Sequence, residues 1–319
     1  MPRRPTIPAI RPNAGIEAEY RRRLARIIAE MHRSTLYWVT ATWGAKPPEM
    51  AQDADPGDSA AWGSYEAAKA AHTIAREAPY WTAGMSPAKA MTETMARLGR
   101  QWEARFDAAS PELARWFSQS VQTRSDAVLK ASLKKGGFTV DWKMTKEAND
   151  VMQATVSQQV SLIKSIPQKY LNDVEGSVLR SVAAGRDLSA MVKEIGPKID
   201  MASIGLGRRP GESDGSVAGR TFRRAAFIAR DQNNKATSMM TKVRYQGLGV
   251  KEAIWYHSHG GRVPRPEHLA FSGKIFEIEK GAFLEGKWTW PAYEPNCGCF
   301  SKPILPGLAH LYKSGVLRI

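Results

Sequence analysis

The side chains best suited to chemistry are gathered in one stretch near the carboxyl end of the chain. Three of the six histidines (His257, His259 and His268) and both cysteines (Cys297 and Cys299) lie within 43 residues. Residues two apart on an extended chain project to the same face, so the Cys-Gly-Cys sequence presents both sulfurs together. Thiolates and imidazoles are the ligands that zinc prefers in a tetrahedral site. The stretch therefore predicts a zinc site made from the two cysteines and nearby histidines.

Two other roles for these residues stay open. Zinc modules more often use Cys-x2-Cys spacing, so the cysteines can instead be small buried hydrophobic residues beside a hydrogen-bonded histidine. A cysteine–histidine pair can also be a nucleophile and its base, but no third orienting group or oxyanion feature is identifiable. We therefore expect no catalytic residues. The enzymatic alternative is a metal-dependent nuclease that uses the three histidines, for which Glu267 is the adjacent carboxylate.

The composition favours a folded protein with a polyanionic partner. The chain has 319 residues, 43% of them hydrophobic, and ten tryptophans, which is typical of a packed core. Its 46 lysines and arginines exceed its 31 acidic residues, giving a net charge of +15. This excess indicates either nucleic acid or an acidic protein surface as partner, and the alternative is a solvated basic surface. No apolar run approaches membrane-spanning length and no signal peptide is visible, so we expect synthesis in the cytoplasm with reduced thiols.

The segment at the amino end carries much of the positive charge. Residues 1–12 contain four prolines and three arginines, which predicts an extended basic arm. Asn13 can cap a helix in which apolar residues recur at helical spacing from Ile16 to Met31, opposite a basic face. A second basic stretch lies around residues 208–224. The candidate contacts with nucleic acid or with a portal protein are Arg3, Arg4, Arg11, Arg21, Arg22, Arg23, Arg26, Arg208, Arg209, Arg220, Arg223 and Arg224.

The rest of the chain reads as helices followed by short strands. The pairs Ser86-Pro87 and Ser110-Pro111 each predict the start of a helix, and Pro167 predicts the end of another. Short apolar runs predict strands at 252–256, 273–278 and 300–304. We expect an α+β fold, mostly helical in the N-terminal two-thirds, with a small C-terminal domain. The expected regions are an arm and amphipathic helix (1–43), a helical region (44–139), a helical connecting region (140–200), a Gly-rich loop (201–219) and an α+β domain (220–319).

An ordered series of short motifs runs through this C-terminal region. Its members are Arg230, Asp231 and Gln232 on a helix, Trp255 on a strand, Arg262, Arg265 and His268, then Gly273, and finally Pro295, Cys297 and Cys299. Over roughly residues 140–305 the series resembles the phage Mu F-like minor head proteins, also called the phage head-morphogenesis family. The chain departs from that pattern twice. Residues 257–261 stand where the family has an acidic residue, and Gly298 replaces an arginine between the cysteines.

The resemblance implies a role in building a virion. It implies a protein made in the bacterial cytoplasm that joins the procapsid interior near the portal vertex and assists head assembly and DNA packaging or retention. The implied partners are the portal, the major capsid or scaffold protein, and double-stranded DNA without sequence preference. Because the match includes His268, that residue is the preferred third zinc ligand, with His257 or His259 as the fourth.

Three further expectations concern the function and the role of residues 1–43. A toxin-like effector carried on a phage-head module is an alternative function, against which we note that residues 306–319 are too few for an appended catalytic domain. The first 140 residues do not obviously match the family, and of these we expect residues 1–43 to dock on the portal or on another procapsid protein. We also expect a chain that begins at Gly44 to fold, because the apolar stripes from Met91 onward lie outside the deleted part.

Overall fold

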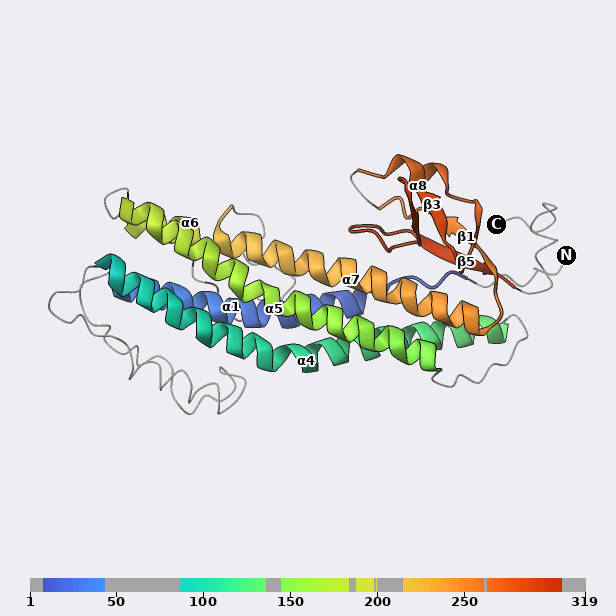
Figure 1. Cartoon of the computed structure of the whole chain (residues 1–319), viewed down its shortest axis with the longest axis horizontal. Helices are drawn as coiled ribbons and strands as arrows, with labels where there is room; N and C mark the ends of the chain where they lie inside the picture. Colours follow the sequence, from blue (N-terminus) through green and yellow to red (C-terminus); the bar gives the residue numbers. More distant parts are fainter. Residues whose placement is uncertain are drawn as a thin grey trace. The chain divides into compact units, whose positions relative to one another are not determined.

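The computed structural model describes residues 8–43, 87–135, 145–183, 188–197, 199, 215–260 and 263–305. The expected α+β class is confirmed (Figure 1). The helices are α1 (Ala14–Trp43), α4 (Pro87–Lys135), α5 (Lys146–Ala183), α6 (Leu188–Ile195), α7 (Val217–Gly247) and α8 (Pro266–Ala270). The strands are β1 (Glu252–Tyr256), β2 (Ile275–Glu277), β3 (Ala282–Leu284), β4 (Lys287–Thr289) and β5 (Phe300–Ile304). None of the described helices has a stretch apolar and long enough to cross a membrane.

The described residues divide into two compact units that share the long helices. Unit 1 combines Met1–Ala25, Phe106–Ser165 and Arg223–Ile319, and unit 2 combines Arg26–Arg105 and Ile166–Phe222. In unit 1, parts of α1, α4, α5 and α7 lie side by side beside the strands (Figure 1). An example of the long-range contacts is the bidentate ion pair between Arg244 on α7 and Asp126 on α4, with both nitrogen–oxygen distances at 2.7 Å. The strands therefore belong to the same unit as these helix segments.

Helix α1 is part of the core. The side chain of Asn13 accepts the amide of Ile16 at 3.0 Å, as its position as a cap predicts. Tyr20 and Leu24 are fully buried in unit 1, where the Tyr20 ring stacks on Phe117 with centroids 4.5 Å apart. Ile28 and Met31 are fully buried as well, in unit 2. This burial argues against the expectation that the chain folds without residues 1–43, because the deletion would remove core side chains.

Of the three prolines that were expected to bound helices, Pro87 begins α4 as predicted, whereas Pro111 and Pro167 lie inside helices. Helix α4 continues through Pro111, and α5 continues through Pro167. A proline within a helix leaves the carbonyl four residues earlier without its amide donor. For Pro111 that carbonyl belongs to Asp107, and the Ser110 hydroxyl donates to it at 3.3 Å. At Ser110-Pro111 the serine hydroxyl therefore replaces the missing amide donor, and the pair does not begin a new helix. Apolar residues on both sides of Pro111 are buried.

The strands form two small antiparallel sheets. One has the order β2-β1-β5, in which Trp255 pairs with Ser301 across β1 and β5. The predicted strands at 252–256 and 300–304 are confirmed, and the middle one is shorter than expected, at Ile275–Glu277. The β3–β4 hairpin was missed. Its two-residue turn, Glu285 and Gly286, has positive φ at both positions, as a primed hairpin turn requires.

Candidate metal site

Three separate elements bring the chemically capable residues to Trp255 in the core of unit 1. Trp255 lies on the central strand β1 and is fully buried. His268 lies on α8, which begins with Pro266 at a position where the missing amide costs no hydrogen bond. The rings of Trp255 and His268 meet edge to face, with centroids 5.2 Å apart. The two cysteines lie just before β5, and both are buried in the same core cluster.

The His268 ring and both sulfurs form a compact set of possible ligands. The Nδ1 atom of His268 lies 3.6 Å from Cys297 Sγ and 3.8 Å from Cys299 Sγ. All three ligand atoms lie within 4.8 Å of one another. A tetrahedral zinc ion with ordinary bond lengths would hold a nitrogen and a sulfur ligand about 3.6 Å apart. The cluster can therefore hold a metal ion, and it is the one such group of three or more among the described residues.

Backbone amides support both sulfurs. Cys297 Sγ receives hydrogen bonds from the amides of Cys299 and Ala292, and Cys299 Sγ receives one from the amide of Ser258. The pKa of Cys297 falls to about 5, first because the Cys299 thiol donates to its sulfur and then because of the amides. The pKa of Cys299 rises, because its proton is held by Cys297 and because the thiol is buried. Such amide donors are the usual outer partners of thiolate ligands.

The other two predicted histidine ligands are not in the cluster. The Nδ1 atom of His257 accepts the amide of His259 at 3.1 Å, and the two rings lie 4.8 Å apart. Burial and the neighbouring His259 lower the pKa of His257. The carboxylate of Glu267, the candidate for a nuclease, accepts the amide of Glu285 at the hairpin turn. The structure therefore brings together three of the five predicted ligands. They are sulfur and nitrogen donors, which suit zinc better than they suit magnesium.

Several motif residues hold the cysteine segment in place. Arg265 donates to the carbonyl of Pro295 at 3.0 Å, and Arg230 donates to the side chain of Asn296 at 3.0 Å. Gly273, with φ at 86°, donates its amide to the carbonyl of Trp255 at 2.7 Å. Arg262 lies outside the described residues. Residues from three parts of the motif series thus converge on Trp255 and on the segment that carries the cysteines.

The predicted basic contact residues are mostly engaged within their own unit. Arg11 lies over the ring of Phe300 at 4.4 Å, and Arg23 lies over Trp116 at 4.0 Å while pairing with Glu19. Arg224 donates to Ser165 at 3.0 Å. The exposed members among the described residues are Arg11, Arg22, Arg26, Arg220 and Arg223. Arg3, Arg4, Arg208 and Arg209 lie outside the described residues.

The two departures from the family pattern touch each other. A Cβ atom added to Gly298 would lie 2.7 Å from Ser258 Oγ and 3.3 Å from Ser258 Cβ. Ser258 is also the residue whose amide bonds Cys299 Sγ. No local pattern indicates a structural role for residue 258, because its contact is made across 40 residues of chain. The Ser258 side chain therefore occupies the space that a side chain at position 298 would need.

We expect Gly298→Arg to lower the free energy of unfolding by about 1–3 kcal/mol, since the added side chain must displace Ser258 from a packed site. Adding Ser258→Gly should recover at least half of that loss, and Ser258→Gly alone is the control. Denaturant titration of the three variants measures the coupling. An arginine cost that is the same in both backgrounds would show that Ser258 is not what requires glycine.

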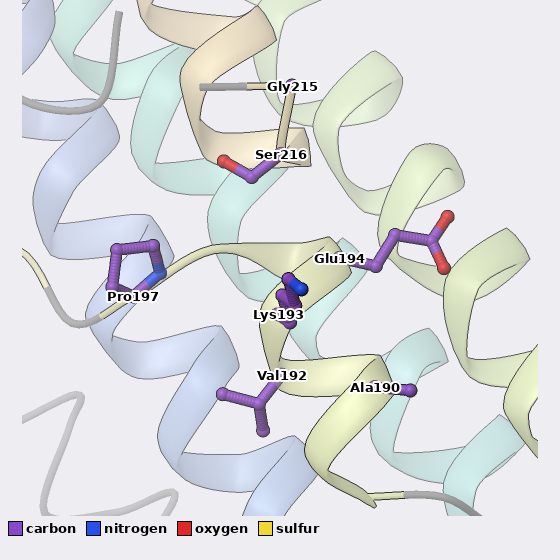
Figure 2. A pocket seen from close by; sticks show the side chains of 7 residues that line it. All are labelled: Ala190, Val192, Lys193, Glu194, Pro197, Gly215 and Ser216. Atoms are coloured by element: carbon purple, nitrogen blue, oxygen red, sulfur yellow. The ribbon is translucent and has the colours of Figure 1, made fainter. Parts of the chain in front are cut away.

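A pocket lies in unit 2. Its walls come from α6 (Ala190, Val192, Lys193 and Glu194), from Pro197 and from the residues that begin α7, Gly215 and Ser216 (Figure 2). The Ser216 hydroxyl accepts the amide of Gly219 at 3.0 Å, so it caps α7. Glu194 is paired with Arg180 on α5, and this pairing lowers its pKa. The described lining contains no histidine or cysteine, so we assign no chemistry to the pocket.

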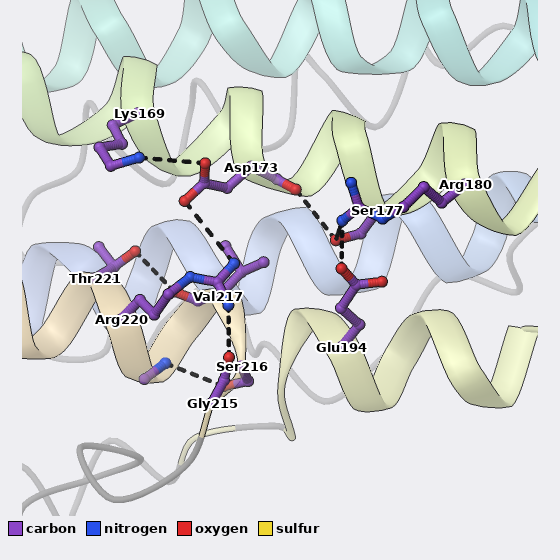
Figure 3. A network of polar contacts seen from close by, with 11 residues as sticks. Lys169, Asp173, Ser177, Arg180, Glu194, Gly215, Ser216, Val217, Arg220 and Thr221 are labelled. Carbon is purple, nitrogen blue, oxygen red and sulfur yellow. Dashed lines mark hydrogen bonds and ion pairs between the residues drawn. The ribbon is translucent and has the colours of Figure 1, made fainter.

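A polar network beside this pocket ties α5 to α6 and α7 (Figure 3). Asp173 accepts Lys169 at 3.4 Å and lies 4.0 Å from Arg220, which also donates to the carbonyl of Gly215. The Ser177 hydroxyl donates to the carbonyl of Asp173 at 3.1 Å. Arg220, predicted from the sequence as a partner contact, therefore serves to fix the start of α7.

Comparisons with known proteins add one distant relative. No protein-family model and no solved structure matches the chain. A curated Haemophilus influenzae protein, described as an uncharacterized protein, is 29% identical over 166 residues. The match covers 51% of this chain and 31% of that relative, so the chain spans about a third of the relative's length. The chain is therefore similar to part of a longer bacterial protein, and this similarity assigns no activity.

Proposed function

We propose that this protein is a non-enzymatic minor head protein of a bacteriophage, which joins the procapsid interior near the portal and assists head assembly and DNA packaging or retention. The observation that carries the proposal is the convergence of the motif series. Its members Trp255, His268, Cys297 and Cys299 come from three different elements of the C-terminal region, and they form one buried cluster. Arg230 and Arg265 contact the segment that carries the cysteines. This convergence supports the resemblance on which the head-assembly role rests.

The metal of this site is proposed to be zinc in a structural role. His268, Cys297 and Cys299 would hold the ion, which would cross-link α8 to the segment before β5. All three residues are at most 4% exposed, which suits a closed structural site better than one that admits a substrate. Within the described residues no carboxylate joins the cluster, so the site offers little support for the nuclease alternative. The protein would then use the metal for rigidity during assembly.

Sequence-independent contact with double-stranded DNA is proposed for the exposed arginines. We expect the full chain to bind unrelated duplexes equally, with an affinity that falls steeply with salt because bound phosphates release counterions. The double change Arg22→Gln and Arg26→Gln should reduce the slope of log affinity against log salt by about 2, if each arginine neutralises one phosphate. Arg100→Gln, an exposed change on α4 outside the proposed set, should leave the slope unchanged. Absence of binding by the parent chain at low salt would assign the positive charge to an acidic protein partner.

The head-assembly proposal is tested on particles. We expect mass spectrometry of purified procapsids and virions from a host that carries the intact gene to detect this chain together with the portal. Disruption of the gene should reduce the yield of DNA-filled heads, and expression of the intact chain from a plasmid should restore it. Normal heads assembled without the chain, with the protein found only in the host cytoplasm, would overturn the proposal. Metal-dependent cleavage of DNA by the purified chain would favour the nuclease instead.

A further inference from the structure

A chain of buried polar side chains crosses unit 1 and ends beside the cysteines. The Tyr20 hydroxyl on α1 donates to Gln159 on α5 at 2.8 Å. Gln159 donates to Gln232 on α7 at 2.7 Å, and Gln232 donates to Asp231 at 3.1 Å. All four side chains are buried. Buried polar groups cost free energy unless they are hydrogen-bonded, so this series fixes the orientation of Asp231.

Three donors surround the Asp231 carboxylate. Its Oδ1 atom accepts the backbone amide of Asn296 at 2.7 Å. Its Oδ2 atom accepts Gln232 and lies 3.5 Å from the ammonium group of Lys235. The carboxylate is about 5% exposed, and a carboxylate accepts bonds at both oxygens without donating any. This side chain is therefore matched to three donors that an amide could not satisfy together.

The amide that Asp231 holds belongs to a constrained turn directly before Cys297. Asn296 has φ at 58°, a left-handed conformation that few residues other than glycine and asparagine adopt readily. The carbonyl of the next residue, Cys297, accepts the side chain of Asn234 at 3.2 Å. Helix α7 thus contacts the turn through Asp231 and Asn234, which lie about one helical turn apart. The contact from Asp231 is the charged one, and charge-assisted bonds are the stronger kind.

We propose that Asp231 is a positioning residue that holds the turn before Cys297 so that both sulfurs face His268 before any metal arrives. The effect of Asp231 on metal binding rests on the zinc site proposed above, whereas its positioning of the turn is a property of the metal-free chain. Helix α7 forms the rigid support, and the buried series through Gln232, Gln159 and Tyr20 ties that support to α5 and α1. Without the carboxylate, the Asn296 amide loses its acceptor, and the cysteine segment opens more often although Arg230 and Arg265 still contact it.

The test compares Asp231→Asn with Asp126→Asn in the metal-free full chain. Asp126 is the matched control, because its carboxylate pairs with the buried Arg244 in the same unit and has no recorded contact with the cysteine segment. The rate at which a thiol reagent labels the cysteines under native conditions reports the opening of that segment. We expect Asp231→Asn to raise this rate about tenfold over the parent, and Asp126→Asn to change it less than twofold at a similar loss of global stability.

Two further measurements separate positioning from general destabilisation. Asn296→Gly keeps the amide that Asp231 holds and suits the left-handed conformation, although it removes the side chain that Arg230 contacts. Its labelling rate should therefore rise less than that of Asp231→Asn. Where the parent binds Co²⁺, Asp231→Asn should weaken the thiolate-to-cobalt absorption, and Asp126→Asn should retain it. Equal labelling rates for the two aspartate variants would overturn the inference even if the parent binds metal. A parent that binds no metal but shows the tenfold difference would overturn the zinc proposal and leave the positioning role standing.

Discussion

The purified protein should carry about one equivalent of zinc, and the double change Cys297→Ser and Cys299→Ser should abolish it. The two sulfurs and His268 Nδ1 supply three ligands at separations that suit a tetrahedral ion, and a hydroxyl replaces a thiolate poorly as a zinc ligand. An ion present at a thousand times its dissociation constant stabilises the folded state by about 4 kcal/mol. Chelation should therefore lower the unfolding temperature of the parent markedly, as measured by metal analysis and thermal denaturation.

Two observations decide how this result is interpreted. His259→Ala should retain the metal, because the His259 ring is not in the cluster, and it serves as the control for a nearby histidine change. The cysteine double variant should be insensitive to chelator, since it has no ion to lose. A folded, metal-free parent whose stability is unaffected by the serine changes would show instead that the cysteines act as small buried hydrophobic residues.

A chain that begins at Gly44 should fail to fold. Deleting α1 removes six large side chains that are at most 9% exposed, and burying each of them contributes about 1.5–3 kcal/mol. Their sum, roughly 9–18 kcal/mol, matches or exceeds the total stability of about 5–15 kcal/mol that native proteins have. The six are Tyr20, Leu24, Ile28, Met31, Trp38 and Val39. Circular dichroism and limited proteolysis of the truncated chain measure the effect.

The control for this deletion changes the exposed surface of α1 alone. Arg22→Gln and Arg26→Gln should each change the free energy of unfolding by no more than about 0.5 kcal/mol, because surface changes away from packed sites cost little. A truncated chain with native helix content and a cooperative melt would contradict the burial of α1. Docking of residues 1–43 on a procapsid protein is therefore best tested with such surface variants, which keep the core.

Local pattern in the sequence determined the class of fold and the place of the site. Alternation and helical spacing depend on neighbouring residues, so the strands at 252–256 and 300–304 and the cap at Asn13 were predictable. The Cys-Gly-Cys spacing likewise placed both sulfurs together without knowledge of the rest. Proline signals were less reliable, because packing on both sides of Pro111 outweighs the cost of one lost helical hydrogen bond.

Contacts between distant segments decided what the site contains. Of three histidines in one stretch, only His268 faces the sulfurs, because α8 packs it against Trp255 while His257 is turned toward His259. The roles of Asp231 and Ser258 depend on partners 65 and 40 residues away, Asn296 and Gly298, and no periodicity records such pairs. Whether α1 is a separable arm or a core helix was equally undecided by its amphipathic pattern. An apolar stripe indicates that one face of a helix is buried, but only the tertiary structure shows which segments bury it.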